Sequence, residues 1–395
     1  MSDAGRLLLA RSLRGFADGV VSVLLAAYLT HLGFAPLQVG AIVTATLLGS
    51  AVLVMALGLA AHRLDLRRVL LGACALMFAT GVLFAGLRSF WPLLVVAVVG
   101  TLNPSAGDVS VFLPAEQAAL AHAVPPRGRT LAFAWYNLCG AFAGAVGALA
   151  SGAPDLLGRK LGIEPIDAER AGFFLYAALA LAAVPVYARL SPRRAEGASA
   201  PLQRSRRTVL GLAALFSLDS FGGGFVVQSL LVLWLYRRFA LDPATAGAVF
   251  FASGLLGALS QLASARLAAR IGHVRTMVFT HLPANLFLIV SGMMPTATLA
   301  VLFLLLRAML SSMDVPARQA YVLSVVPKEE RAAAASVTNV PRSLASAVPP
   351  LITGWLLDHG ASGLPLFIAG GLKAAYDLLL LWRFARIRPL DEQEP

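Results

Sequence analysis

Long apolar stretches without a charged residue dominate this chain. The clearest are residues 69–87, 89–107, 130–154, 243–265 and 276–306. An α-helix needs about 20 apolar residues to cross a bilayer, and each run is close to that length or longer. Only 13% of all residues are charged, whereas a soluble domain has about 25%. The sequence therefore predicts an all-α integral membrane protein and excludes a soluble enzyme.

Twelve transmembrane helices are expected. The run 276–306 is too long for one helix, and Gly292 and Pro295 divide it into two. The other spans carry at most three charged residues each. The expected spans are 11–31, 38–61, 69–87, 90–113, 130–151, 172–189, 208–235, 244–265, 275–293, 297–318, 331–356 and 364–384.

The basic residues predict the orientation of these spans. With the N-terminus inside, 22 Lys and Arg residues fall on the cytoplasmic side and 6 on the outer side. Such a bias predicts that both termini are cytoplasmic. It also accounts for the net charge of +12 without nucleic acid, because the excess cations would meet anionic lipid headgroups.

A basic segment rich in small residues, 189–207, divides the chain into two parts of similar length. It has no apolar periodicity and is expected to be a cytoplasmic linker. The predicted domains are an N-terminal six-helix bundle at 1–188, a C-terminal six-helix bundle at 208–388 and a cytoplasmic tail at 389–395.

The two halves are related in sequence. At a constant offset of 202 residues, 114–152 and 316–354 share 14 identities in 39 positions, including Asn137 with Asn339. The first span also corresponds to the seventh, so that Arg14 aligns with Asp219. These observations predict two pseudo-symmetric bundles that arose by duplication, related by an axis along the membrane normal.

At this point the chain resembles the major facilitator superfamily of secondary transporters, in its bacterial form. Twelve spans, cytoplasmic termini, a basic central loop and parallel 6+6 halves carry the resemblance. The family signature between spans 2 and 3 is matched in part by Gly58-Leu-Ala-Ala-His62-Arg63-Leu-Asp65-Leu-Arg67-Arg68. The resemblance implies a substrate site between the halves, lined by spans 1, 4, 7 and 10 and reached alternately from each side. It also implies a monomer.

Ionisable residues inside the spans are the main candidates for the substrate and proton pathway, because each costs at least about 2.5 kcal/mol in the bilayer. Six of them lie on the four spans that the resemblance places at the cavity: Arg14, Asp18, Asp108, Asp219, Arg307 and Asp314. Arg342 in span 11, Asn137 and Asn339 complete the candidate set.

Structural roles compete with these functional ones. Arg14 with Asp18, and Lys373 with Asp377, are spaced to pair along one helix face. The acids Asp108 and Asp314 are either cytoplasmic gate residues, paired with Arg129, Arg318 or Arg331, or proton sites.

Three further alternatives stay open from the sequence. Arg342 is either a substrate ligand or a packing anchor. Asn137 and Asn339 either join helices or contact the substrate. The loop residues Arg63, Asp65, Arg67 and Arg68 form either a conformational gate or a solvated loop.

Span 4 is expected to be broken. It carries four more residues than span 10 between its Asp and the following Pro, which is about one helical turn. Asn103-Pro104 precede this insertion, and a proline removes a backbone hydrogen bond. The break either exposes backbone carbonyls to a cavity or is a plain kink.

The function predicted from these features is proton-coupled secondary transport of a small anionic or amphiphilic molecule. No Gly-rich loop followed by Gly-Lys-Ser/Thr is present, and no metal or cofactor is expected. Export is slightly favoured over import. A polytopic membrane enzyme and a lipid flippase are the alternatives. The excess of Arg over Lys suggests a bacterial inner membrane.

Overall fold

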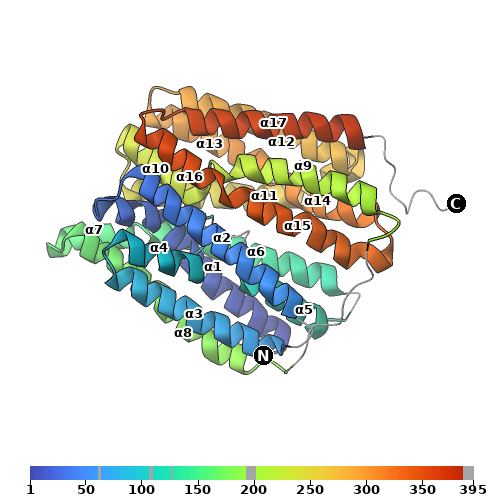
Figure 1. Ribbon diagram of the computed structural model, residues 1–395, viewed down its shortest axis with the longest axis horizontal. Helices are drawn as coiled ribbons and strands as arrows, with labels where there is room; N and C mark the ends of the chain where they lie inside the picture. The colour runs from blue at the N-terminus through green and yellow to red at the C-terminus, as the bar shows by residue number, and fades with distance from the viewer. Residues whose placement is uncertain (61–63, 106–109, 126–127, 193–201, 386–395) are drawn as a thin grey trace. The chain divides into compact units, whose positions relative to one another are not determined.

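The structure, a computed structural model, describes residues 1–60, 64–105, 110–125, 128–192 and 202–385. All regular elements in these ranges are helices. The fold is all-α, with helices that follow the twelve predicted spans, and this prediction is confirmed. Figure 1 shows the helices with the labels used below.

Eight of the predicted spans are single helices. They are α1 (Asp3–His31), α2 (Pro36–Ala60), α3 (Leu66–Gly86), α6 (Arg129–Ala150), α8 (Pro165–Ala188), α11 (Pro243–Ile271), α12 (His273–Met293) and α17 (Leu364–Phe384). A short helix, α7 (Ala153–Leu161), follows α6.

The other four spans are each divided into two helices. The pairs are α4 (Phe90–Val99) with α5 (Phe112–Ala123), α9 (Arg206–Gly224) with α10 (Gln228–Phe239), α13 (Ala297–Ser311) with α14 (Asp314–Ser324), and α15 (Arg331–Ala347) with α16 (Pro349–Asp358). A 3₁₀ turn, η3 (Lys328–Glu330), precedes α15.

The breaks follow from local sequence. The predicted break in span 4 is confirmed, since α4 ends before Gly100 and Asn103 accepts hydrogen bonds from the backbone and side chain of Ser105. In span 7, α9 ends in three consecutive glycines, which have the lowest helix propensity after proline. In span 11, α16 starts at Pro349, which has no backbone N–H to donate to the preceding turn.

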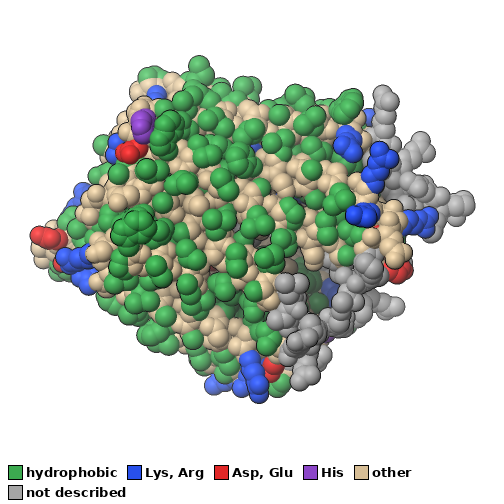
Figure 2. All heavy atoms as spheres, in the orientation of Figure 1, with side chains coloured by type: hydrophobic (Ala, Val, Ile, Leu, Met, Phe, Trp, Pro, Cys, Tyr) green, Lys and Arg blue, Asp and Glu red, His purple; other side chains and the backbone are tan. Residues whose placement is uncertain are grey.

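Apolar side chains cover the surfaces of the helices. Ten helical stretches in the described ranges are long and apolar enough to cross a membrane. The two predicted spans outside this set, 90–113 and 331–356, are among those divided into shorter helices. Figure 2 shows hydrophobic side chains spread over the helices, with Lys and Arg gathered toward helix ends, as a multi-pass membrane protein requires.

Two compact units make up the chain. The first contains Met1–Gly197, Val227–Gly254 and Pro350–His359, and the second contains Ala198–Val226, Leu255–Pro349 and Gly360–Pro395. The first unit therefore includes two segments from the second half of the sequence. The domain boundary predicted at the linker 189–207 was placed from the sequence repeat, whereas these two units are defined by contacts. That boundary therefore stays a prediction.

Helix α1 is the central helix of the first unit. Every residue from Ala17 to Leu29 is buried. A Cβ added at Gly19 would lie 2.0 Å from the carbonyl oxygen of Gly144 in α6, so the two backbones are in direct contact. Small residues of α6 thus allow close helix packing.

The segment that begins at Val227 joins the first unit through hydrogen bonds to α1 and to the break in span 4. The hydroxyl of Ser229 donates to the carbonyl oxygens of Ser22 at 2.9 Å and Pro104 at 3.0 Å. The amide of Gln228 donates to the hydroxyl of Ser22 at 2.8 Å.

In the second unit, α9 packs along α15 and α12 packs along α17. Its core includes Phe216, Met277, Tyr321 and Leu380, all nearly inaccessible to solvent. This framework holds the charged side chains described below.

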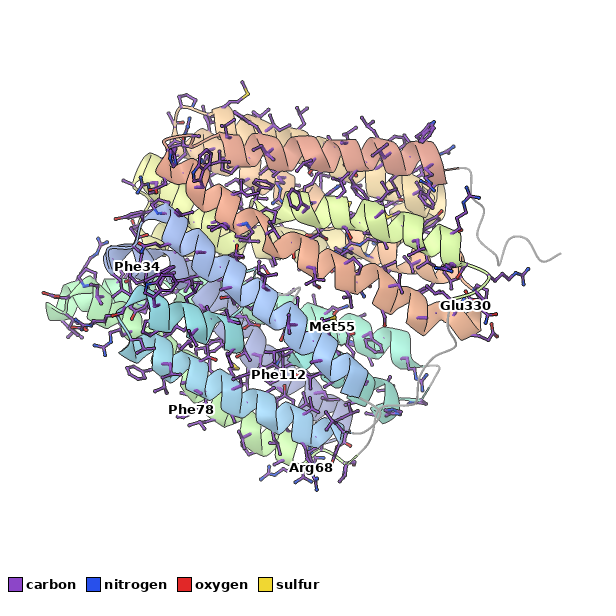
Figure 3. All side chains as sticks on the ribbon, viewed as in Figure 1. Phe34, Met55, Arg68, Phe78, Phe112 and Glu330 are labelled. Carbon is purple, nitrogen blue, oxygen red and sulfur yellow. The ribbon has the colours of Figure 1, made fainter. Side chains whose placement is uncertain are left out.

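A carboxylate anchors the start of α9 in this unit. Glu330, labelled in Figure 3, accepts hydrogen bonds from the hydroxyl of Ser205 and from the backbone N–H groups of Gln203, Arg204 and Ser205. These bonds, above all the one from the hydroxyl of Ser205, lower the pKa of Glu330 to about 2.

Candidate functional site

A buried ion pair joins α1 and α5 in the first unit. The guanidinium of Arg14 donates to both carboxylate oxygens of Glu116, from Nε at 3.2 Å and from Nη2. Glu116 also accepts hydrogen bonds from the hydroxyls of Tyr136 and Tyr187. Arg14 is 2% exposed and Glu116 is fully buried. The charges are mutually compensated, as buried ions must be.

The surroundings fix this pair in place. The ring of Phe112, labelled in Figure 3, lies 4.2 Å from the guanidinium carbon of Arg14 and forms a cation–π contact. Nη1 of Arg14 donates to Ser110 at 3.1 Å. Donors occupy both oxygens of Glu116, so the ion pair joins α1 to α5 in a fixed geometry.

Asp18 lies on the same helix and is 4% exposed. The charges of Arg14 and Arg11 and the side chain of Asn103 act on its carboxylate. The expected pairing of Arg14 with Asp18 along α1 is wrong, because Glu116 takes the guanidinium of Arg14.

Arg11, the first residue of the predicted span 11–31, is a buried cation. It is 7% exposed, because α1 already begins at Asp3, and its guanidinium contacts the ring of Tyr136. No described residue accepts a hydrogen bond from its Nε or Nη1. A prediction that the first helix begins well before residue 11 would have indicated that this arginine is buried.

Asp219 is the centre of a charge network in the second unit. Its Oδ1 accepts a hydrogen bond from Nζ of Lys373 at 2.7 Å, and its Oδ2 accepts one from Nη1 of Arg318 at 3.4 Å. Asp219 is 5% exposed. Two cations, from α17 and α14, therefore compensate the carboxylate of α9.

His281 of α12 connects Asp219 to a second carboxylate. Its Nδ1 lies 3.0 Å from Oδ1 of Asp377, and its Nε2 lies 3.9 Å from Oδ1 of Asp219. Asn285 donates to the other oxygen of Asp377 at 2.9 Å. The expected pairing of Lys373 with Asp377 is wrong, because Lys373 reaches Asp219 and Asp377 is bound by α12 instead.

Asp314 and Arg307 extend the network. Asp314 pairs with Arg318 at 3.3 Å along α14, one of the pairings proposed from the sequence. Nε of Arg307 is buried, and no described residue accepts a hydrogen bond from it. The acids that act on Arg307 electrostatically are Asp219 and Asp314.

The other candidates of the second unit lie apart from this network. Arg342 donates to the hydroxyl of Ser220 at 3.1 Å and to Oδ1 of Asn339 at 3.2 Å. The Asn339 side chain thus accepts a hydrogen bond within its own helix. Asn339 is exposed, as is Asn137 in the first unit.

The predicted gate loop is described only in part. Asp65 caps α3 by accepting a hydrogen bond from the backbone N–H of Arg67 at 3.0 Å. Arg68, labelled in Figure 3, is exposed. Arg63 and Asp108 lie outside the described residues.

Glu116 and His281 were missed as candidates, and Arg318 was considered only as a partner of Asp108 or Asp314. Glu116 and Arg318 stand at equivalent positions of the 202-residue repeat, and this alignment was a usable signal. His281 lies in an uncharged apolar run, where a lone polar ring is costly to bury without partners. In the described part of the chain, no group of three or more His, Cys, Asp or Glu residues is arranged to hold a metal ion.

Comparisons with known proteins agree with this architecture. The sequence model of the Major Facilitator Superfamily matches residues 7–236 and 212–395. The uncharacterized membrane protein YJR124C of Saccharomyces cerevisiae is 28% identical over 94% of this chain and 92% of its own length.

Solved transporters share the fold. The nucleoside transporter NupG has a TM-score of 0.73 and 15% identity, over 98% of this chain and 100% of that one. The xylose transporter XylE from E. coli, in an inward-open conformation, has a TM-score of 0.75 and 13% identity, over 98% of each chain. At these identities the likeness concerns the fold alone.

Proposed function

Because the chain belongs to the Major Facilitator Superfamily, we propose that it moves a small anionic molecule across a membrane by alternating access, coupled to protons. Family membership makes it a multi-pass transporter and not an enzyme, so the polytopic membrane enzyme considered from the sequence is set aside.

The observation that carries the anionic substrate is Arg307. The guanidinium of Arg307 stays charged at any physiological pH. Its side chain is half-buried, and no described residue accepts a hydrogen bond from its buried Nε. Asp219 and Asp314 act on Arg307 from a distance, but both are already paired with Lys373 or Arg318. An anionic group of the substrate would supply the missing acceptor for Nε of Arg307.

Proton coupling is supported by the buried acids and the histidine of the second unit. No nucleotide-binding sequence is present, so the driving force must be an ion gradient or the substrate gradient itself. Asp219, Asp377 and His281 form a connected, buried set of groups that can exchange protons. At the corresponding place, the first unit has the Arg14–Glu116 pair, in which hydrogen-bond donors already occupy both carboxylate oxygens.

The test uses purified protein and the variant Arg307→Ala, with Arg270→Ala, an exposed arginine of α11, as the control. Small carboxylates, phosphates and sulfonates are screened for an increase in melting temperature. We expect the wild type and Arg270→Ala to be stabilised by the same anions. Arg307→Ala should melt near the wild type without anion and lose the anion-induced increase. A large loss of stability with the anion effect retained would make Arg307 a structural residue.

Lipid flipping is the alternative for an amphiphilic cargo. Translocation of a fluorescent phospholipid by protein in vesicles, with no stabilisation by soluble anions, would favour a flippase. Export, predicted from the sequence, is tested by the direction of flux in right-side-out and inverted vesicles.

We also propose a bacterial inner membrane location, a monomer and cytoplasmic termini. The support for the termini is the bias of basic residues toward one side. A cysteine placed at Ala198, after replacement of Cys74 and Cys139, should react with an impermeant reagent only from the cytoplasmic side. Labelling from outside alone would reverse the orientation.

A further inference from the structure

We infer that His281 is the residue that binds and releases the transported proton, and that an anion bound at Arg307 favours its protonation. This inference rests on the proposed function and specifies its proton site and the sign of coupling. Both residues belong to the second unit, and their positions around Asp219 carry the inference.

Both ring nitrogens of His281 face carboxylates. The imidazole is 3% exposed, with Nδ1 3.0 Å from Asp377 and Nε2 3.9 Å from Asp219. A carboxylate can only accept, so Nδ1 is assigned as the donor to Asp377. In the neutral ring, Nε2 then directs a lone pair toward the anionic Asp219, which is repulsive. A proton on Nε2 converts this contact into an attraction.

The acids of the network are less suited to this task. Asp219 is bound by two cations, Lys373 and Arg318, and protonating it would leave both uncompensated. Asp377 accepts hydrogen bonds from Asn285 and from His281, so donors already occupy both of its oxygens. Asp314 is paired with Arg318. The imidazole is the group whose protonation state can change with the least disturbance.

The charged groups in contact with His281 are Asp219 of α9 and Asp377 of α17. One ion pair further out, Lys373 of α17 and Arg318 of α14 bind Asp219, and Asp314 of α14 pairs with Arg318. Tyr376 of α17 presents its ring edge-on at 6.1 Å, and its hydroxyl is buried without a hydrogen-bond partner among the described residues.

Charge balance links the proton to the substrate. Within the ion-pair network of the described residues, three carboxylates face two cations, so a neutral His281 leaves one negative charge in excess. Arg307 of α13 forms no ion pair with a described acid, but Asp219 and Asp314 interact with it electrostatically, and its charge equals the excess. When an anion neutralises Arg307, the negative excess returns, and a proton on His281 restores neutrality.

Such linkage is reciprocal: the anion raises the affinity for the proton, and the proton raises the affinity for the anion. Anion and proton would then travel together in the same direction. An inward proton gradient would drive uptake, opposite to the export suggested by the sequence.

The experiment measures anion affinity as a function of pH. The probe is whichever of succinate, inorganic phosphate and methanesulfonate raises the wild-type melting temperature most. For the wild type we expect binding to be tighter at about pH 5.5 than at about pH 8, because a higher proton concentration favours the protonated ring. A coupling of typical size corresponds to a change of about 5–150-fold in the dissociation constant.

His281→Gln removes the titratable ring and should remove this pH dependence while the probe still binds. In proteoliposomes it should retain probe exchange without a gradient and lose uptake driven by a pH gradient. His359→Gln, at an exposed position, is the matched control and should behave like the wild type. If His281→Gln does not fold, His281→Gln with Asp377→Asn removes the facing acid as well, and the same pH independence is expected.

The outcomes separate the two levels of the proposal. Unchanged pH dependence in the histidine variants would overturn the role of His281 while leaving anion transport in place. Tighter binding of the probe to the wild type at the higher pH would show that the proton opposes anion binding, and would overturn the proposed positive cooperativity. If none of the three probes stabilises the wild type or is transported, the anionic substrate class fails, and the inference fails with it.

Discussion

Glu116 and Arg318 occupy equivalent positions, 202 residues apart, and each forms a buried ion pair with the first span of its own sequence half. The polarity of the two pairs is opposite. Helix α1 carries the cation, Arg14, in the first unit, whereas α9 carries the acid, Asp219, in the second. The first pair is closed by two tyrosines, and the second is extended by further ionisable groups. The asymmetry favours a structural role for the first and proton coupling for the second.

The first prediction concerns Glu116→Gln. The change leaves the buried guanidinium of Arg14 without its counter-charge, so we expect the unfolding free energy to fall by about 3–5 kcal/mol. Melting of the purified protein in detergent measures this loss, and Glu164→Gln, at an exposed position, should have little effect. Replacing both partners, as Arg14→Met with Glu116→Leu, should recover much of the stability. No loss in the single variant would show that the pair does not stabilise the fold.

The second prediction concerns Asp219→Asn. From the sequence, a near-isosteric change at a lone acid should leave folding intact. The ion pairs with Lys373 and Arg318 argue for the opposite, a loss of about 3–5 kcal/mol from two uncompensated cations. The double variant Asp219→Asn with Lys373→Gln should be more stable than the single one. Asp358→Asn, which is exposed, serves as the control. Equal melting temperatures for the wild type and Asp219→Asn would instead support the view that this change leaves folding intact.

The third prediction tests the contact of α1 with α6. In Gly19→Ala the new Cβ would lie 2.0 Å from a backbone oxygen that no rotamer change can move, so we expect a loss of about 1–3 kcal/mol. Gly72→Ala in α3 meets no atom within 4 Å and should stabilise its helix by about 0.5–1 kcal/mol. The comparison is informative because both changes add the same methyl group. Similar melting temperatures for the two variants would contradict the close packing.

The fourth prediction concerns pH and Glu330. Its pKa is lowered from 4.5 to about 2 in the folded protein, chiefly by the hydroxyl of Ser205. A lowered acid pKa stabilises the folded state fully above about pH 4.5 and progressively less as the pH falls toward 2. Glu330→Gln should therefore be less stable than the wild type at neutral pH, and the difference should narrow over this acidic range. Glu329→Gln, at an exposed position, should show no such dependence.

The helices were predictable because the bilayer imposes one length on every span. Even the break in span 4 followed from counting residues against span 10. The ion pairs were harder, because a charge can pair along its helix or with a helix a hundred residues away. Local spacing joined Lys373 to Asp377, but the structure joins it to Asp219, 154 positions earlier. Arg11 and Arg318 were placed at the ends of the spans 11–31 and 297–318, because the charged residues themselves had been used to set the span ends.

The presence of residues 227–254 and 350–359 in the first unit has a consequence for biosynthesis. A ribosome that has finished the N-terminal half has not yet made all the chain that this unit packs together. Final packing must wait until His359 has emerged, when nine-tenths of the protein is already synthesised. Early-inserted helices therefore stay in the membrane with part of their contact surface uncovered, and an expression system that stalls late in the chain would leave both units incomplete.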